Sequence, residues 1–187
     1  MRTDLPKTIY LKDYKPFPFS IDKVDMNFDL QPEFSVVTTK ASYTRNEKDA
    51  DLFLYGEELE LLSLKINGQD HTDFEKDDAS LTVKNVPDEF ELEIITKIYP
   101  DKNTRLEGLY MSGGNYCTQC EAEGFRRITF FPDRPDVLST YSVRMSGAKA
   151  QFPVLLCNGN RVDSGESADG GDHWAEWHDP WPKPSYL

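Results

Sequence analysis

The sequence is poor in cysteine, with three residues in a chain of 187. Such a low and odd number provides no disulfide framework and is typical of a reducing compartment. No apolar run approaches the roughly 20 residues that a membrane-spanning helix needs. The first residues, M-R-T-D-L-P-K-T-I-Y-L-K-D-Y, have no apolar core of a secretory signal. The sequence therefore predicts a cytoplasmic protein that does not enter a membrane.

Positive charge is also scarce. Lys and Arg number 21 against 33 Asp and Glu, which gives a formal net charge of −12. Nucleic acids and anionic membranes are bound by basic surfaces, so the balance argues against both as partners. An acidic surface suits a cationic ligand, although a solvated acidic surface without a ligand has the same composition.

Catalytic signatures are missing. The chain has no H-E-x-x-H and no G-x-S-x-G, and its three histidines, His71, His173 and His178, do not have the spacing of a metal site. Cys117 and Cys120 form C-x-x-C, but only one further cysteine remains, too few for a four-cysteine zinc site. We therefore expect no catalytic residue and no metal ligand in this chain, and two cysteines on opposite faces of a strand.

The sequence is rich in strand patterns instead. Residues 24–30 alternate apolar and polar side chains, which predicts a strand with one buried face. Asn67-Gly68 is a strong hairpin signal. Helix is expected only as a short turn at 135–138, with Asp133 as its cap. The expected strands are 24–30, 33–44, 58–66, 79–84, 90–98, 140–146 and 152–157, with a late hairpin that pairs 160–164 with 173–177.

Short strands at regular spacing predict an all-β fold, a saddle-like β-sandwich of mostly antiparallel sheets with little helix. Residues 1–187 contain no internal repeat or linker, and they read as one domain. The chain ends in apolar residues where a further strand would begin, so we expect it to be part of a longer protein.

The segment 117–136, C-T-Q-C-E-A-E-G-F-R-R-I-T-F-F-P-D-R-P-D, has the densest polar chemistry. If its first half is extended, Cys117, Gln119, Glu121 and Glu123 share one face and Thr118 lies on the other. An amide and two carboxylates on one side predict a site that receives a cationic group. The polar face of an exposed strand is the alternative. A glycosidase pair is disfavoured, because carboxylates two residues apart on a strand point the same way.

Residues 118–137 resemble the signature TQ-x-E…R…F-P…D-x-P of zinc aminopeptidases of the aminopeptidase N family, and their Q-C-E-A-E-G-F-R is closest to the bacterial branch. Further matching phrases are L-E-G-L-Y at 106–110, L-C-N-G-N at 156–160 and D-P-W-P-K-P at 179–184. The resemblance extends over essentially the whole chain.

The resemblance implies the N-terminal β domain of a multidomain aminopeptidase, which packs over a thermolysin-like catalytic domain that follows it. Gln119 then matches the glutamine that lines the pocket for the first side chain, and Glu121 matches the glutamate that binds the α-ammonium of peptide N-termini. The zinc ligands and the general base belong to the following domain, so zinc is expected in the intact enzyme and this fragment alone is expected to be inactive. We expect Arg126 and Arg127 to be structural.

One alternative belongs to a different class of function. A stand-alone β-sandwich module could bind a cationic partner through an acidic face. A severed domain would expose a larger apolar surface than such a monomeric module does.

Overall fold

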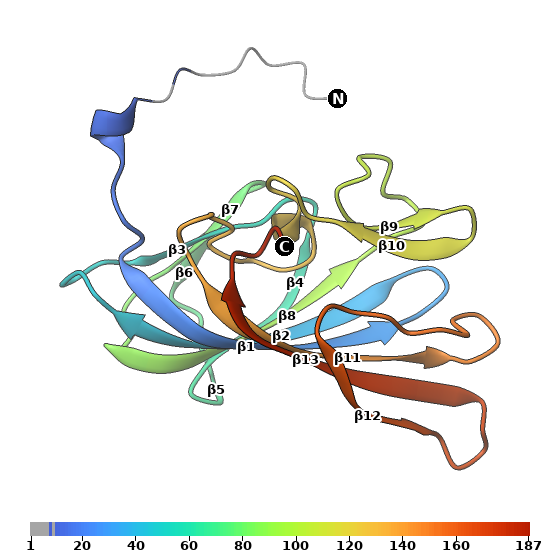
Figure 1. Ribbon diagram of the computed structural model, residues 1–187. Helices are drawn as coiled ribbons and strands as arrows, with labels where there is room; N and C mark the ends of the chain where they lie inside the picture. Colours follow the sequence, from blue (N-terminus) through green and yellow to red (C-terminus); the bar gives the residue numbers. More distant parts are fainter. Residues whose placement is uncertain (1–7, 9) are drawn as a thin grey trace.

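The computed structural model describes residue 8 and residues 10–187, so most of the segment read for a secretory signal lies outside the described residues. The main feature is an eight-stranded sheet with the order β12-β13-β11-β1-β2-β8-β4-β5, and two small sheets, β3-β7-β6 and β9-β10, lie above it (Figure 1). The elements are η1 (Leu11–Asp13), β1 (Phe19–Leu30), β2 (Ser35–Arg45), β3 (Leu52–Tyr55), β4 (Glu60–Ile66), β5 (Gln69–Asp70), β6 (Phe74–Lys76), β7 (Ser80–Val83), β8 (Glu89–Ile98), β9 (Gly108–Ser112), β10 (Asn115–Gln119), η2 (Phe125–Arg127), β11 (Ser139–Ala148), β12 (Asn160–Glu166) and β13 (Asp172–Lys183).

Strand β1 shows how the sequence builds the large sheet. Val24, Met26, Phe28 and Leu30 are all buried, as their alternation predicts, and they define the inner face of the sheet. The strand pairs antiparallel with β2 and parallel with β11. The sheet is therefore mixed, although its other pairings are antiparallel. The predicted all-β class is confirmed.

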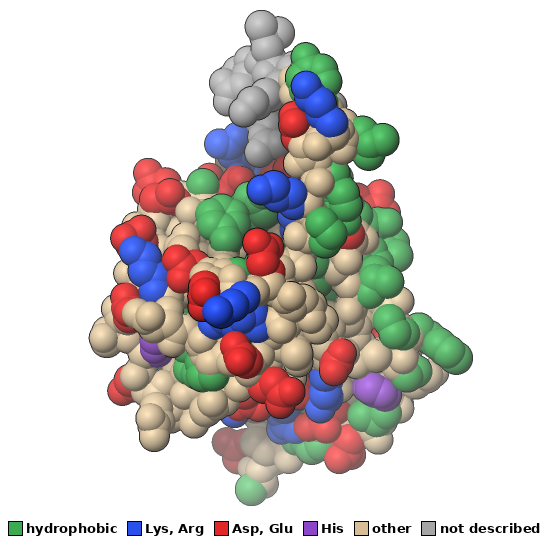
Figure 2. Space-filling view, turned by 90° about the vertical axis from the view of Figure 1, so that its left-hand side faces the viewer, with side chains coloured by type: hydrophobic (Ala, Val, Ile, Leu, Met, Phe, Trp, Pro, Cys, Tyr) green, Lys and Arg blue, Asp and Glu red, His purple; other side chains and the backbone are tan. Residues whose placement is uncertain are grey.

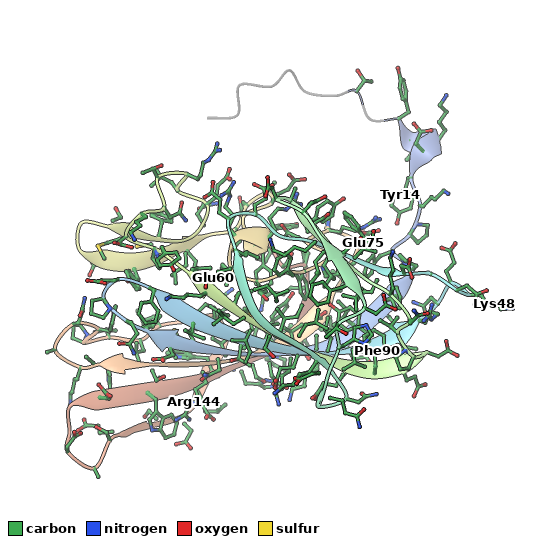
Figure 3. The ribbon with its side chains drawn as sticks, turned by 180° about the vertical axis from the view of Figure 1, so that it is seen from behind. Tyr14, Lys48, Glu60, Glu75, Phe90 and Arg144 are labelled. Carbon is green, nitrogen blue, oxygen red and sulfur yellow. The ribbon has the colours of Figure 1, made fainter. Side chains whose placement is uncertain are left out.

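The core lies between the inner face of the large sheet and the small sheets. Leu52, Leu54, Leu81 and Val83 of the β3-β7-β6 sheet are completely buried against it. The Thr96 hydroxyl of β8 donates to the backbone of the segment after η2, which fixes that segment onto the sheet. Figure 3 shows this layer of side chains filling the space between the sheets. The small sheets thus cover an apolar face that the large sheet could not leave in water.

Two local predictions are wrong. Residues 152–157 form no strand, although Phe152 and Leu155 are buried while Val154 is exposed. Pro153 has no N–H to donate, and the segment lies over the inner face of the sheet, where its side chains are buried without ladder hydrogen bonds. Residues 135–138 form a turn and no helix. Within the described part of the chain, no helix is long and apolar enough to cross a membrane.

Candidate functional site

The predicted site begins at the end of β10. Gln119 is the last residue of this strand and pairs with Gly108 of β9. The chain then turns through residues 121–124 into η2, so Glu121 and Glu123 do not continue the strand face on which the sequence places them. Cys120 likewise lies beyond the end of the strand that was expected to carry both cysteines. The prediction that residues 117–123 form one extended strand face is therefore wrong. The strand ends at Gln119, and a tight turn follows it.

A close backbone contact forces this turn. The Gly124 N–H donates to the Cys120 carbonyl at 2.9 Å. A Cβ atom at Gly124 would lie 2.3 Å from the Gln119 carbonyl oxygen and 2.9 Å from the Gly108 nitrogen. Only glycine allows the turn to fold back so tightly against the β9-β10 hairpin. The sequence analysis, which took this segment as extended, could not predict the contact, because the contact forms only when the β9-β10 hairpin is in place.

The structure brings the two predicted binding residues together. The Gln119 side-chain amide donates to the backbone carbonyl of Glu121 at 3.3 Å. Both residues are exposed, and the peptide bond between Glu121 and Ala122 is cis. Among the described residues, no hydrogen bond or ion pair engages the Glu121 carboxylate. An exposed carboxylate is thus presented at the end of β10 beside an amide.

Arg126 anchors the turn from inside. Its Nε donates to the Asp133 carboxylate at 2.8 Å, and its guanidinium lies 3.5 Å from the carboxylate of Glu123. The Ser185 hydroxyl donates to the other Asp133 oxygen at 2.7 Å. The side chain of Asp133 is therefore committed to Arg126 and Ser185, which corrects its predicted role as a helix cap. Arg126 is therefore structural, as expected, and it braces the turn that follows β10.

Arg127 is held by a different set of carboxylates. It approaches Glu57 at 2.5 Å, Glu58 at 2.9 Å and Glu107 at 3.3 Å. Both arginines thus have acidic partners of their own, and neither pairs with Glu121. On the molecular face drawn in Figure 2, acidic and basic side chains are intermixed.

The histidines and cysteines do not form a metal site. In the described ranges, no group of three or more His, Cys, Asp or Glu side chains is placed to hold a metal ion. His178 contacts the Ser142 hydroxyl, whereas His173 contacts the Phe152 carbonyl. All three cysteines are free, and burial raises the pKa of Cys120 to about 12, so its thiol stays protonated.

Sequence reasoning missed one feature close to the site. A cavity lies behind β10, and Thr118, Cys120 and Tyr141 of β11 are among the residues that line it. The alternation of Tyr141, Val143 and Met145 predicts an inner strand face, but only the placement of the β9-β10 hairpin shows that this face encloses a space.

A family model and several curated proteins match this chain over most of its length. The model of the peptidase M1 N-terminal domain matches residues 18–187. The chain is similar to curated proteins described as aminopeptidase N, with 53% identity to that of Caulobacter vibrioides over 100% of this chain and 45% identity to that of Escherichia coli over 99%. It spans only 22% and 21% of those two relatives.

Solved structures show the same fold. A Legionella pneumophila aminopeptidase A, crystallised in complex with aspartic acid, superposes with a TM-score of 0.87 at 34% identity, over 94% of this chain and 21% of that one. An M1 zinc metallopeptidase from Deinococcus radiodurans has a TM-score of 0.74 at 16% identity, over 90% of this chain and 41% of its own. The motif, the fold and these similarities show that the chain belongs to the peptidase M1 N-terminal domain family. Within this family it corresponds to the N-terminal domain of aminopeptidase N.

Proposed function

We propose that residues 1–187 form the N-terminal domain of a longer cytoplasmic zinc aminopeptidase, and that Glu121 binds the free α-ammonium of a peptide while Gln119 lines the pocket for its first side chain. The observation that carries the proposal is the Glu121 carboxylate, which is exposed, engaged by no other described residue and fixed on a braced turn beside the Gln119 amide. The partners are peptide N-termini and the catalytic domain that follows.

An exopeptidase must recognise the end of its substrate. A carboxylate that accepts hydrogen bonds from an ammonium group gains about 1.5–3 kcal/mol for each of them. Fixing the ammonium also orients the scissile carbonyl, which belongs to the same N-terminal residue, and this favours turnover as well as binding. Such a group has to be rigid. The glycine contact at Gly124 and the Arg126–Asp133 pair provide that rigidity.

Zinc would be held outside this chain, since the described residues contain no suitable set of ligands. Zinc bound in the intact enzyme would supply an activated water for peptide hydrolysis. The part of this chain is to bind and orient the substrate, with the carboxylate of Glu121 as the fixed anion. By itself, the 187-residue chain would be inactive.

The test uses the intact enzyme that carries this domain. Glu121→Gln keeps the shape of the side chain and removes its charge, so kcat/KM should fall by about one to three decades, or about 1.4–4 kcal/mol of transition-state stabilisation. Glu123→Gln removes the same charge from the same turn and is the matched control. If the two variants lose activity equally, or if Glu121→Gln is indistinguishable from wild type, Glu121 is not the anchor.

A further inference from the structure

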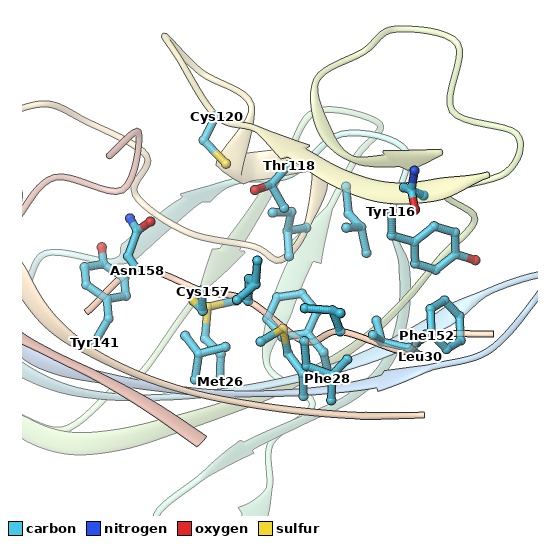
Figure 4. A pocket seen from close by; sticks show the side chains of 18 of the residues that line it. Met26, Phe28, Leu30, Tyr116, Thr118, Cys120, Tyr141, Phe152, Cys157 and Asn158 are labelled. Carbon is cyan, nitrogen blue, oxygen red and sulfur yellow. The ribbon is translucent and has the colours of Figure 1, made fainter. Parts of the chain in front are cut away.

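The cavity behind β10 opens to the surface between apolar side chains. Its volume is about 570 Å³, and Figure 4 shows Met26 and Phe28 of the large sheet on one side of it and Thr118 of β10 on the other. Two of its lining residues, Val154 and Leu156, are 67% and 72% exposed, so they lie at its mouth and not in its interior. Apolar side chains that gather at one place on a surface, and are not scattered singly, mark a contact surface.

Leu187 lies at the same mouth. It lines the cavity and is 55% exposed. Its backbone carbonyl accepts a hydrogen bond from the Asn158 side chain, and the nearby Ser185 hydroxyl donates to the buried carboxylate of Asp133. Figure 1 shows this end of the chain above the large sheet, on the side of the small sheets. Any residue that follows Leu187 therefore begins at the mouth of the cavity, from a fixed position.

A tethered segment is favoured over a second copy as the occupant of this surface. The chain spans only 22% and 21% of two curated relatives, and its family model describes an N-terminal domain. Residues that follow closely on Leu187 in a longer protein have an effective concentration in the millimolar range at the mouth. A second copy carries the same formal net charge of −12, so it is repelled as it approaches.

We propose that an apolar segment of the chain that follows Leu187 docks against Val154 and Leu156 and covers the cavity. This inference rests on the part of the proposed function that places a catalytic domain after this chain. It does not depend on the roles of Glu121 and Gln119.

The lining selects for an apolar segment. Its charged side chains, Asp179 and Lys183, form an ion pair with each other, so a charge on the docked segment would find no unpaired counterion here. Thr118 precedes Gln119 in β10 and lines the cavity. The docked segment therefore supports, from the inner side, the strand that carries Gln119.

Cysteine labelling tests the docking directly. Val154→Cys is compared between the 187-residue chain and the intact enzyme, with iodoacetamide followed by peptide mass spectrometry. The thiol should react rapidly in the 187-residue chain and at least about tenfold more slowly in the intact enzyme, because a covered group reacts only when the contact opens. Val162→Cys is the matched control. Val162 of the edge strand β12 is 60% exposed and does not line the cavity, so this variant should react equally fast in both proteins.

Leu156→Asp places a carboxylate in the proposed contact. Because the position is exposed, the variant of the 187-residue chain should unfold at the same urea concentration as wild type. In the intact enzyme the docked segment would have to bury an unpaired charge, so Leu156→Asp should restore rapid labelling of Val154→Cys. Leu62→Asp, at a position of β4 that is 48% exposed and does not line the cavity, is the control and should leave the protection unchanged.

Equal labelling of Val154→Cys in the two proteins would overturn the proposal. Protection in the 187-residue chain that increases with its concentration would also overturn it, since a second copy would then cover the surface. Glu121→Gln separates this inference from the proposed function, because it should lower kcat/KM without changing the labelling. Rapid labelling in the intact enzyme, together with a kinetic loss in Glu121→Gln, would refute the docking surface and leave the ammonium anchor intact. Protection without that kinetic loss would refute the anchor alone.

Discussion

The Nε atom of Arg126 lies 2.8 Å from a carboxylate oxygen of Asp133, and the two side chains are only 7% and 1% exposed. The Ser185 hydroxyl donates to the other oxygen of the same carboxylate. One buried acid thus joins the turn after β10 to the segment that follows β13. The position of Glu121, five residues before Arg126, depends on this connection.

Replacing Asp133 with Asn should destabilise the domain strongly. The change keeps the volume of the side chain but leaves the buried Arg126 without its main counterion. Glu123, at 3.5 Å, compensates only in part. Loss of one partner from a buried pair costs about 3–5 kcal/mol, and we expect a value near the lower end in urea unfolding. Glu166→Gln, which breaks the exposed pair with Lys149, is the control and should change little. Equal effects of the two variants would contradict the structural role of Asp133.

Gly124→Ala should displace the turn that carries Glu121. The added methyl group would lie 2.3 Å from the Gln119 carbonyl, a backbone atom that cannot rotate away. We expect a loss of about 1–3 kcal/mol in unfolding free energy, as for other overpacked sites, and reduced kcat/KM in the intact enzyme. At Gly171 an added Cβ would meet only the Asp169 side chain at 3.5 Å or beyond, so Gly171→Ala should be tolerated. Normal stability of Gly124→Ala would show that the turn is not so constrained.

Stability should fall in acid because of Glu93. Hydrogen bonding and attraction to Lys40 hold the pKa of this carboxyl below its ordinary value of 4.5, and Lys65 adds to the effect. The folded state therefore binds this proton less readily than the unfolded state. The resulting stabilisation is complete above the ordinary carboxyl pKa and is lost as the pH falls through the lowered one. Unfolding free energies measured from neutral pH into this acid range should fall less steeply for Glu93→Gln than for wild type, and identical slopes would contradict this assignment.

Cys120 should be nearly inert toward alkylation in the folded chain. Burial raises its pKa from 9.0 to about 12, which lowers the reactive thiolate fraction at neutral pH by about a thousandfold. Iodoacetamide followed by peptide mass spectrometry should show slow modification of Cys120 in the native chain and rapid modification in urea. Comparable rates in the two states would mean that the thiol is accessible and ionisable.

The 187-residue chain should neither bind zinc tightly nor hydrolyse peptides. Its described residues offer no cluster of metal ligands, and the general base is expected in another domain. Zinc titration followed by calorimetry, together with an assay on an aminoacyl amide substrate, would check both points. Stoichiometric tight zinc binding by the isolated chain would contradict the proposal that another domain holds the zinc.

Much of the fold could be predicted because the signal for a half-buried strand is local. The alternation in residues 24–30 places Val24 and Met26 on the buried face of β1, as the structure shows. The late hairpin, with its polar loop between β12 and β13, was equally readable. The same reasoning failed for residues 152–157, where the buried residues Phe152 and Leu155 are three apart and do not alternate as in a strand. A segment that crosses a sheet face contains apolar residues much as a strand does.

The candidate site was predicted as a set of residues and not as a geometry. The sequence by itself determined the all-β class, the inner face of β1 and the presence of Gln119 and Glu121 in one short motif. Only the tertiary structure decided that Glu121 lies on a turn, that Asp133 pairs with Arg126, and that Tyr141 faces a cavity. The physical reason is that these features depend on contacts between segments distant in the chain: the hairpin that Gly124 approaches, the segment at Ser185 and the sheet beneath β10.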